Sequence, residues 1–305
     1  MPLVSVFCLV YNHENYIREC LDNILSQRCG FRYEVIVHDD ASTDSSAEII
    51  KEYENKYPDV IVPIYQTHNQ YKEIGFNGII KLMHERSVGK YVAFCEGDDY
   101  WTDSFKLQKQ VDFLEQNQAC SMCFHNAMIR NEATENTYFI PIRVEGRLYS
   151  VKEVFDDWIV PTASILMRKS VFDIYVMDKR IINADINCVM ACAHYGDIYG
   201  MKDYMSVYRI QDSGVTMQSV RNADVDQYVR MLQHYRCLYE NYKLISYSSY
   251  SRKMIHSMIS LASYYKKNGK YGKMLRYLFQ ALFMNPVQTV LRLMQSMNCN
   301  QINKC

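Results

Sequence analysis

The chain has 305 residues, of which 49% are apolar and 22% are charged, as in ordinary folded proteins. This composition excludes an intrinsically disordered chain, and the length allows one large domain or one domain with an appendage. The 34 basic and 34 acidic side chains balance, and we expect no nucleic-acid partner.

The cysteines and the first apolar run indicate the cellular compartment of the protein. The 11 cysteines are odd in number and have no regular spacing, which indicates reduced thiols rather than a disulfide framework. The run Leu3–Val10 is too short to span a membrane and lacks the pattern of a signal peptide. We therefore expect a cytoplasmic protein.

Strand and helix patterns alternate four times in the first third of the chain. Residues 3–10, 33–39, 59–65 and 90–94 have the pattern of strands, and residues 14–27, 44–57, 76–86 and 104–117 have the pattern of helices. This alternation predicts an α/β fold with an open, mixed, largely parallel sheet and helices on both faces.

The rest of the chain is less regular up to residue 216 and helical beyond it. We expect a strand at 119–129, a short helix, a strand and a helix within 145–172, a helix at 186–195 and a strand at 204–210. Helical patterns then cover 224–242, 251–269, 270–285 and 286–297. The prediction is an α/β domain of residues 1–216, with halves 1–129 and 130–216, followed by a helical region of residues 217–305.

Ligands of such sheets bind at the carboxyl ends of the strands, and this is where the sequence places its unusual polar residues. They are Tyr11 and Asn12 after the first strand, Asp39 and Asp40 after the second, and Glu96, Asp98 and Asp99 after the fourth. Three neighbouring carboxylates repel one another unless a cation is present. The chain has neither G-x-G-x-x-G after the first strand nor a P-loop. We therefore expect Mg²⁺ or Mn²⁺ that bridges the carboxylates to a diphosphate.

Four segments, residues 4–27, 33–50, 89–115 and 204–216, resemble the successive motifs of family 2 glycosyltransferases with the GT-A fold, in the branch found with bacterial surface polysaccharides. The resemblance implies a Rossmann-like sheet, a nucleotide-binding half in residues 1–129 and an acceptor half in residues 130–216. It also implies inverting transfer of a sugar from a nucleotide diphosphate donor, UDP-linked by preference, to a glycan or lipid-linked acceptor, with a divalent metal.

The resemblance also implies a role for each of these polar residues. Tyr11 falls where the family stacks an aromatic ring on the nucleobase, with Asn12 beside it, and Asp40 falls where a carboxylate bonds the base edge, with Asp39 beside it. Glu96 replaces the first Asp of the family's D-x-D site, Asp98 is expected near the ribose or the metal, and Asp99 on the metal. The chain departs from the family at Val10 and Gln211, where Thr and His are usual.

An inverting transfer needs a base that removes the acceptor proton. In relatives this is an Asp at the start of a helix before the 204–210 strand, and Asp185 matches that place. Asp197 is the rival, because it also precedes the strand. We prefer Asp185, since a helical pattern follows it directly and Asp197 has the surroundings of a turn.

Two other functions share parts of this pattern. A nucleotidyltransferase that makes sugar nucleotides would need a Gly-rich basic loop after the first strand, which residues 10–16 lack. A non-catalytic sugar-nucleotide-binding protein would keep Asp40 and the 96–99 carboxylates without needing Asp185.

Residues 251–305 contain nine Lys or Arg and no Asp or Glu, so the other residues carry a net charge of minus nine. This segment predicts contact with an anionic membrane surface or packing on the acidic remainder of the chain.

Overall fold

A computed structural model describes residues 1–140, 143–211 and 224–302, with side chains described to residue 295. Its elements form two compact units. The first unit contains Met1–Lys179 and a second segment that begins at Asn183 and holds the last helix and the last strand of the sheet domain. The second unit contains Arg180–Ile182 and the C-terminal helices. The boundary predicted between residues 216 and 217 lies outside the described residues.

The strands of the first unit are β1 (Val4–Val10), β2 (Tyr33–Asp39), β3 (Ile61–Tyr65), β4 (Tyr91–Phe94), β5 (Tyr100–Trp101), β6 (Cys120–Asn131), β7 (Asn136–Phe139), β8 (Arg147–Tyr149), β9 (Leu166–Arg168) and β10 (Asp197–Ile210). Its helices are α1 (Ile17–Leu25), α2 (Ser46–Lys56), α3 (Gln70–Arg86), α4 (Lys106–Gln116), α5 (Val151–Asp156) and α6 (Ala184–Tyr195), with 3₁₀ turns η1 (Thr162–Ser164) and η2 (Lys169–Ile174). The second unit contains α8 (Val225–Asn241), α9 (Tyr247–Lys267), α10 (Tyr271–Met284) and α11 (Pro286–Ile302).

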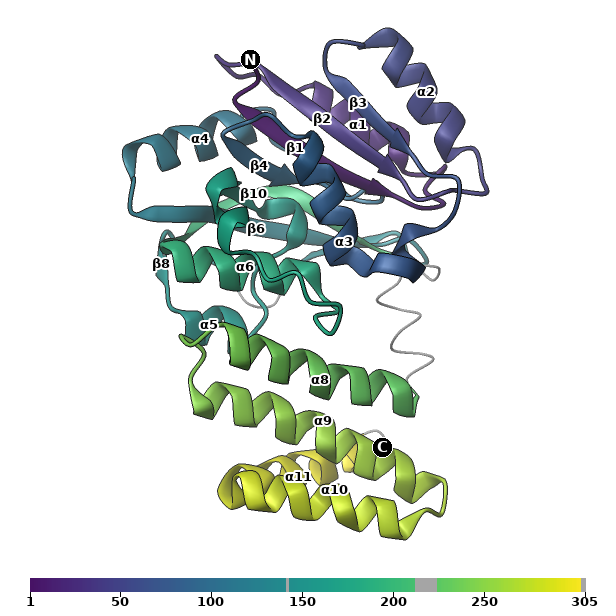
Figure 1. Ribbon diagram of the computed structural model, residues 1–305, viewed down its shortest axis with the longest axis vertical. Coiled ribbons are helices and arrows are strands. Elements are labelled where there is room, and N and C mark those ends of the chain that lie inside the picture. The colour runs from purple at the N-terminus through teal and green to yellow at the C-terminus, as the bar shows by residue number, and fades with distance from the viewer. Residues whose placement is uncertain (141–142, 212–223, 303–305) are drawn as a thin grey trace. The chain divides into compact units, whose positions relative to one another are not determined.

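The strands form one mixed sheet in the order β3-β2-β1-β4-β9-β6-β10-β5, with β7 beside β6 and β8 beside β10. Figure 1 shows β1, β2, β3 and β4 at one side of this sheet and β6 and β10 beyond them. The pairs β2–β3, β1–β2, β1–β4 and β6–β10 are parallel. Strand β9 is antiparallel to both of its neighbours, β4 and β6, and joins the two parallel groups.

Strands β1 and β4 are buried along their whole length, because both faces of the sheet are covered. On one face the side chains of Val6 and Cys8 belong to a core that includes residues of α1, α2 and α4. On the other face Phe7 packs edge-on against Phe94 and also contacts Phe172 of η2. The predicted open mixed sheet with helices on both faces is confirmed.

Two local predictions were wrong. Helix α3 begins at Gln70 rather than at residue 76, and it contains a kink at Gly75, whose φ of 66° suits glycine. Asp197 is not in a turn, because it is the first residue of β10 and pairs with Cys120 of β6. The apolar periodicity begins only after the kink, and the start of β10 carries too few β-branched residues to signal a strand.

The four helical patterns after residue 223 correspond to α8, α9, α10 and α11. Gly269 has a φ of 69° and ends α9, where the Lys270 amide donates to the Tyr265 carbonyl at 2.9 Å. No helix in the described part of the chain is long and apolar enough to cross a membrane. The cysteines whose side chains are described are free thiols, and all but Cys29 are buried.

Candidate functional site

The loops that follow β1, β2 and β4 are bonded to one another at the carboxyl edge of the sheet. The Asn12 amide donates to Ser42 Oγ at 3.0 Å, and Asn12 Oδ1 accepts from the Thr43 amide at 2.7 Å. The Gly97 amide donates to the Leu9 carbonyl at 2.8 Å. The predicted residues of these three loops therefore lie at one edge, as the parallel order of the strands requires.

Gly97 is placed where no side chain fits. A Cβ atom at this position would lie 2.9 Å from both His13 Nδ1 and Val10 Cγ2. The carboxylate loop of residues 96–99 therefore rests directly on the segment after β1, and the glycine in the E-G-D-D sequence permits this close approach.

Asp39 and Asp40 have different surroundings, although both side chains are buried. The two carboxylate oxygens of Asp40 accept from the amides of Gln70, at 2.6 Å, and Tyr71, at 3.0 Å, so Asp40 caps the first turn of α3. Asp39 Oδ1 is buried without a hydrogen-bond partner, and Oδ2 accepts a long bond of 3.4 Å from the Ser42 amide. Burial raises the pKa of Asp39.

The side chains of Asp98 and Asp99 are held by residues at the end of β10. Asp99 is 1% exposed, and its Oδ1 accepts from the Arg209 amide at 2.9 Å. Asp98 Oδ2 accepts from Gln211 Nε2 at 2.8 Å and lies 3.8 Å from His13 Nε2. Gln211, which replaces the histidine usual in the family, thus contacts a predicted site residue.

The carboxylates of the loop of residues 96–99 repel one another. Burial, followed by the charges of Asp98 and Asp185, raises the pKa of Glu96 to about 8. Burial and the charges of Asp98 and Glu96 also hold the pKa of Asp99 well above its usual value. Such mutual repulsion is what a bound cation would relieve.

Arg209 belongs to the candidate site, although the sequence pattern did not point to it. Its guanidinium donates to the Asp98 carbonyl at 2.7 Å, to Glu132 at 2.9 Å and to Glu19. It also lies over the rings of Tyr16 and Tyr100, with its carbon 5.1 and 4.4 Å from the ring centroids. The available signal was a single cation inside the otherwise uncharged strand pattern at 204–210.

Asp185 is the second residue of α6, where its Oδ1 accepts from the Ile186 amide at 2.7 Å. Burial raises its pKa, and its charge acts on Glu96. Asp197 lies at the other end of the sheet, because it begins the 14-residue strand β10 whose far end carries Arg209. At about 3.3 Å per residue the two ends are roughly 40 Å apart.

Tyr11 and Asn12 form the exposed border of this site. The Tyr11 side chain is 41% exposed, so its ring is open to a ligand. Asn12 and Ala41, one in each of two adjoining loops, have φ values of 58° and 59°. Non-glycine residues in this region of backbone space gather at functional sites.

The oxygen atoms of the carboxylate loop of residues 96–99 suit a hard cation that also binds a ligand. Among the described residues, no three His, Cys, Asp or Glu side chains are arranged to hold a metal ion by themselves. Glu96, Asp98 and Asp99 offer oxygen ligands, and Mg²⁺ is often bound by one or two carboxylates together with substrate phosphates. The residues therefore fit a metal that takes its remaining ligands from a bound molecule.

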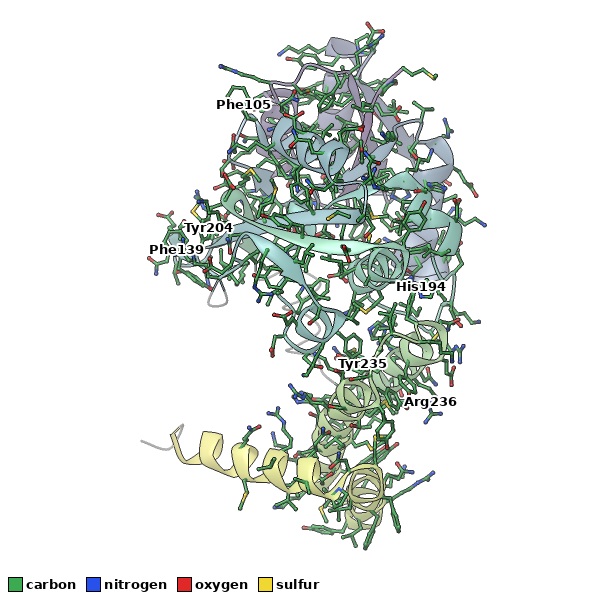
Figure 2. The ribbon with its side chains drawn as sticks, turned by 90° about the vertical axis from the view of Figure 1, so that its left-hand side faces the viewer. Phe105, Phe139, His194, Tyr204, Tyr235 and Arg236 are labelled. Atoms are coloured by element: carbon green, nitrogen blue, oxygen red, sulfur yellow. The ribbon has the colours of Figure 1, made fainter. Side chains whose placement is uncertain are left out.

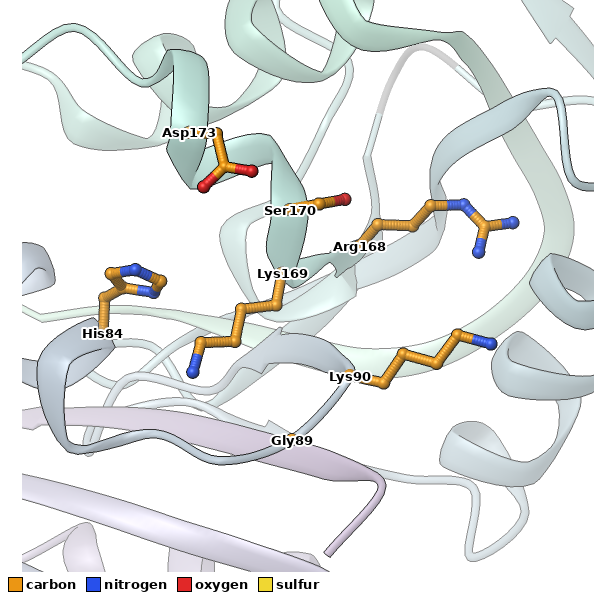
Figure 3. Close-up of a pocket in the computed structure, with 7 residues that line it drawn as sticks. All are labelled: His84, Gly89, Lys90, Arg168, Lys169, Ser170 and Asp173. Atoms are coloured by element: carbon orange, nitrogen blue, oxygen red, sulfur yellow. The ribbon is translucent and has the colours of Figure 1, made fainter.

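A separate hollow of about 390 Å³, drawn in Figure 3, lies where β4 begins and β9 ends. The loop of residues 96–99 follows the other end of β4. The side chains of Lys90 and Lys169 point in opposite directions there, and Lys90 is paired with Glu115 at 2.7 Å. Arg168 donates to the carbonyls of Cys120 and Leu114. These cations serve the fold and do not converge on a ligand.

Comparison with curated proteins gives relatives from bacteria. Over 215 residues, 70% of this chain, it is 35% identical to an uncharacterised protein of Mycobacterium tuberculosis, and the match spans 60% of that protein's length. Over 217 residues it is 26% identical to the putative teichuronic acid biosynthesis glycosyltransferase TuaG of Bacillus subtilis, covering 70% of this chain and 82% of TuaG.

Solved structures share the fold. One is TarS of S. aureus, residues 1–349, in complex with UDP-GlcNAc, with a TM-score of 0.63, 17% identity and coverage of 92% of this chain and 81% of that one. Another is the mannosyltransferase PcManGT of Pyrobaculum calidifontis in complex with GDP-Man and Mn²⁺, with a TM-score of 0.58, 15% identity and coverage of 97% and 80%. Residues 5–175 match the family described as glycosyl transferase family 2. With more than half of its length matched, the chain belongs to glycosyl transferase family 2.

Proposed function

We propose that this chain transfers a sugar from a nucleotide diphosphate sugar to an acceptor hydroxyl in the synthesis of a bacterial surface polysaccharide, with inversion at the anomeric carbon. The observation that carries the proposal is the position of Asp98 and Asp99 at the carboxyl edge of the sheet, where Gln211 and Arg209 hold their side chains through hydrogen bonds of 2.8 and 2.9 Å. Family membership and the similarity to TuaG support it, and the fold shared with the UDP-GlcNAc complex of TarS supports a UDP-sugar donor.

The donor's base and ribose would lie along the loops after β1 and β2. The exposed ring of Tyr11 offers a stacking surface beside Asn12. The unpartnered Oδ1 of Asp39 is an acceptor for an N–H on the base edge. Asp40, which the sequence analysis placed on the base edge, positions the first turn of α3 beside it.

The metal, Mg²⁺ or Mn²⁺, would be held by Asp98 and Asp99, with Glu96 as a third oxygen source. The Mn²⁺ complex of PcManGT supports a divalent metal. When bound, the cation supplies charge neutralisation for the diphosphate leaving group. The chain's own contribution is orientation, because Arg209 and Gln211 fix Asp99 and Asp98 through hydrogen bonds of 2.9 and 2.8 Å.

Asp185 is the proposed general base. Burial raises its pKa, which makes the carboxylate a stronger proton acceptor. It takes the proton of the acceptor hydroxyl while that oxygen forms the bond to the anomeric carbon and the nucleoside diphosphate leaves. The acceptor is a glycan or a lipid-linked glycan, and a lipid-linked acceptor would bring the reaction to the cytoplasmic face of the membrane.

The test is transfer and donor hydrolysis against a panel of UDP-, GDP- and TDP-sugars, with Mn²⁺, with Mg²⁺ and with EDTA. Metal-dependent release of one nucleoside diphosphate is the expected result. Nucleotide-sugar binding without turnover of any donor would instead indicate a non-catalytic binding protein.

Calorimetry on Asp99→Asn distinguishes a role of this residue in metal binding from a role in binding the nucleotide sugar. We expect the Mn²⁺-dependent part of donor affinity to be lost, while metal-free donor binding stays near wild type. Unchanged donor affinity in the variant, with and without Mn²⁺, would remove Asp99 from the metal site.

A further inference from the structure

Helices α10 and α11 leave rows of large apolar side chains exposed. They are Tyr271, Leu275, Phe279, Leu282 and Phe283 on α10, and Val287, Val290, Leu291 and Met294 on α11. Phe283 is 89% exposed. Scattered apolar residues on a surface are ordinary, but rows on two consecutive helices indicate a surface that binds something.

The row on α10 is not the face that packs inside the unit. Spacings of three and four residues place its members along one side of the helix. The packed side is marked by Ala281, which is fully buried, and by Tyr277, whose ring stacks on Tyr265 of α9 at 5.9 Å with an angle of 12°. The exposed row therefore has no role in holding α10 against α9.

The same holds for α11. Thr289 is fully buried, and Gln288 Oε1 accepts from Ser251 Oγ of α9 at 3.1 Å. At 100° per residue the Val287–Met294 row lies on the opposite side of the helix from Thr289. Both helices thus have one face bound to the unit and one apolar face turned outward.

The surroundings of the two rows are positively charged. Arg276 lies beside the α10 row, Lys273 lies between that row and the packed side of the helix, and Lys266, Lys267 and Lys270 lie at the turn before it. In the described part of the chain, none of these five cations forms an ion pair with a carboxylate, and residues 251–305 contain no Asp or Glu. Lys273 lies over the ring of Tyr265, with its nitrogen 5.4 Å from the centroid.

A hollow of about 440 Å³ adjoins the α10 row and is lined by Arg236, Met258, Gln280, Phe283 and Met284. Arg236 projects from α8 of the same unit (Figure 2). The hollow places a further cation beside the most exposed ring of the row.

We propose that the outward faces of α10 and α11 bind an anionic lipid bilayer, with the apolar rows in the interface and the Lys and Arg side chains at the level of the headgroups. Amphipathic helices with a basic polar side bind membranes in this way. The charge pattern argues against a second copy of the chain, because a two-fold contact would bring like charges together without an acid in the segment to neutralise them. The inference goes beyond glycosyl transfer and does not depend on it.

The experiment is co-sedimentation of the full chain with phosphatidylcholine vesicles that contain or lack phosphatidylglycerol, at low and high salt. We expect binding only to the anionic vesicles and weaker binding at high salt. Each basic residue near such a surface contributes about fivefold in affinity, so Lys273→Glu/Arg276→Glu should weaken binding by about 25-fold or more. Phe279→Ser/Phe283→Ser should lower the bound fraction at both salt concentrations.

Matched controls come from the first unit. Phe139 is 62% exposed and packs against Tyr204 (Figure 2), and Phe139→Ser should leave vesicle binding unchanged. Lys56→Glu/Lys81→Glu makes the same change in net charge away from the proposed surface. Donor binding without lipid, measured on every variant, keeps this test separate from the proposed activity.

Equal weakening by the control and test variants, or equal binding to neutral and anionic vesicles, would overturn the proposal. So would sedimentation velocity in which Phe279→Ser/Phe283→Ser turns an oligomer into a monomer while vesicle binding persists, because the rows would then be a contact between copies.

Discussion

The backbone amide of Arg209 donates a hydrogen bond of 2.9 Å to Oδ1 of Asp99, 110 residues earlier in the chain. The guanidinium of the same arginine donates to the carbonyl of Asp98. One residue near the end of β10 therefore fixes two consecutive residues of the carboxylate loop.

Arg209→Gln should lower the free energy of unfolding of the first unit by about 2 kcal/mol, because it removes the charge-assisted hydrogen bonds that the nearly buried guanidinium donates to Glu132 and Glu19. Arg130 also pairs with Glu132, at 3.1 Å, but is 39% exposed, so Arg130→Gln should change stability by less than about 1 kcal/mol. Urea unfolding of the two variants gives the comparison. Equal losses would show that the Arg209 contacts add nothing beyond a surface ion pair.

Gly97→Ala should displace the carboxylate loop, because the new methyl group would meet His13 and Val10 at 2.9 Å. We expect a stability loss of about 1–3 kcal/mol and a donor affinity reduced by about tenfold, which corresponds to 1.4 kcal/mol. Gly30→Ala is the control, since its Cβ would meet Gln108 only at 3.8 Å. Wild-type donor affinity in Gly97→Ala would mean that the loop position is not set by this contact.

Asp185→Asn should preserve the fold and the donor affinity while lowering turnover by about 10² to 10⁴, the usual contribution of a positioned base. Asp197→Asn should leave turnover unchanged, because this residue lies at the opposite end of β10. Steady-state turnover of the two variants decides which aspartate is the base. Slow turnover of Asp197→Asn together with normal turnover of Asp185→Asn would reverse the assignment.

His234 should make the second unit sensitive to acid. Its side chain is fully buried, its Nδ1 accepts from the Ile182 amide at 3.3 Å, and burial lowers its pKa to about 4. Because an unfolded histidine titrates near 6.5, the unfolded chain binds the proton first as the pH falls. The stability that this group contributes is present above pH 6.5 and is lost between pH 6.5 and 4, to a total of about 3 kcal/mol.

Thermal or urea unfolding across that pH range measures the effect. His234→Asn keeps an acceptor but does not titrate, so its stability should be flatter between pH 6.5 and 4 than that of the wild type. Parallel curves for the two proteins would show that His234 does not cause the dependence.

Sequence patterns sufficed for the alternating strands and helices because each buried strand, such as residues 4–10, is a continuous apolar run with its own local signal. They also placed Asp39, Asp99 and Asp185 at element ends that the fold brings to one edge. They did not reveal Arg209, since its partners Asp98 and Glu132 lie 111 and 77 residues away. The capping role of Asp40 was missed because the first turn of α3 lies before Gly75 and lacks apolar periodicity.

The position of β9 also has a consequence for biosynthesis. This short strand inserts between β4 and β6, although it follows both in the chain. During translation one edge of β4 stays unpaired until residue 168 has been made, and such an open edge is prone to pair with other chains. The pairing is also non-local, which slows folding. Recovery of activity after refolding should therefore lag behind the recovery of helical circular dichroism, because the site is complete only when β9 has closed the sheet and β10 has been added beside β6.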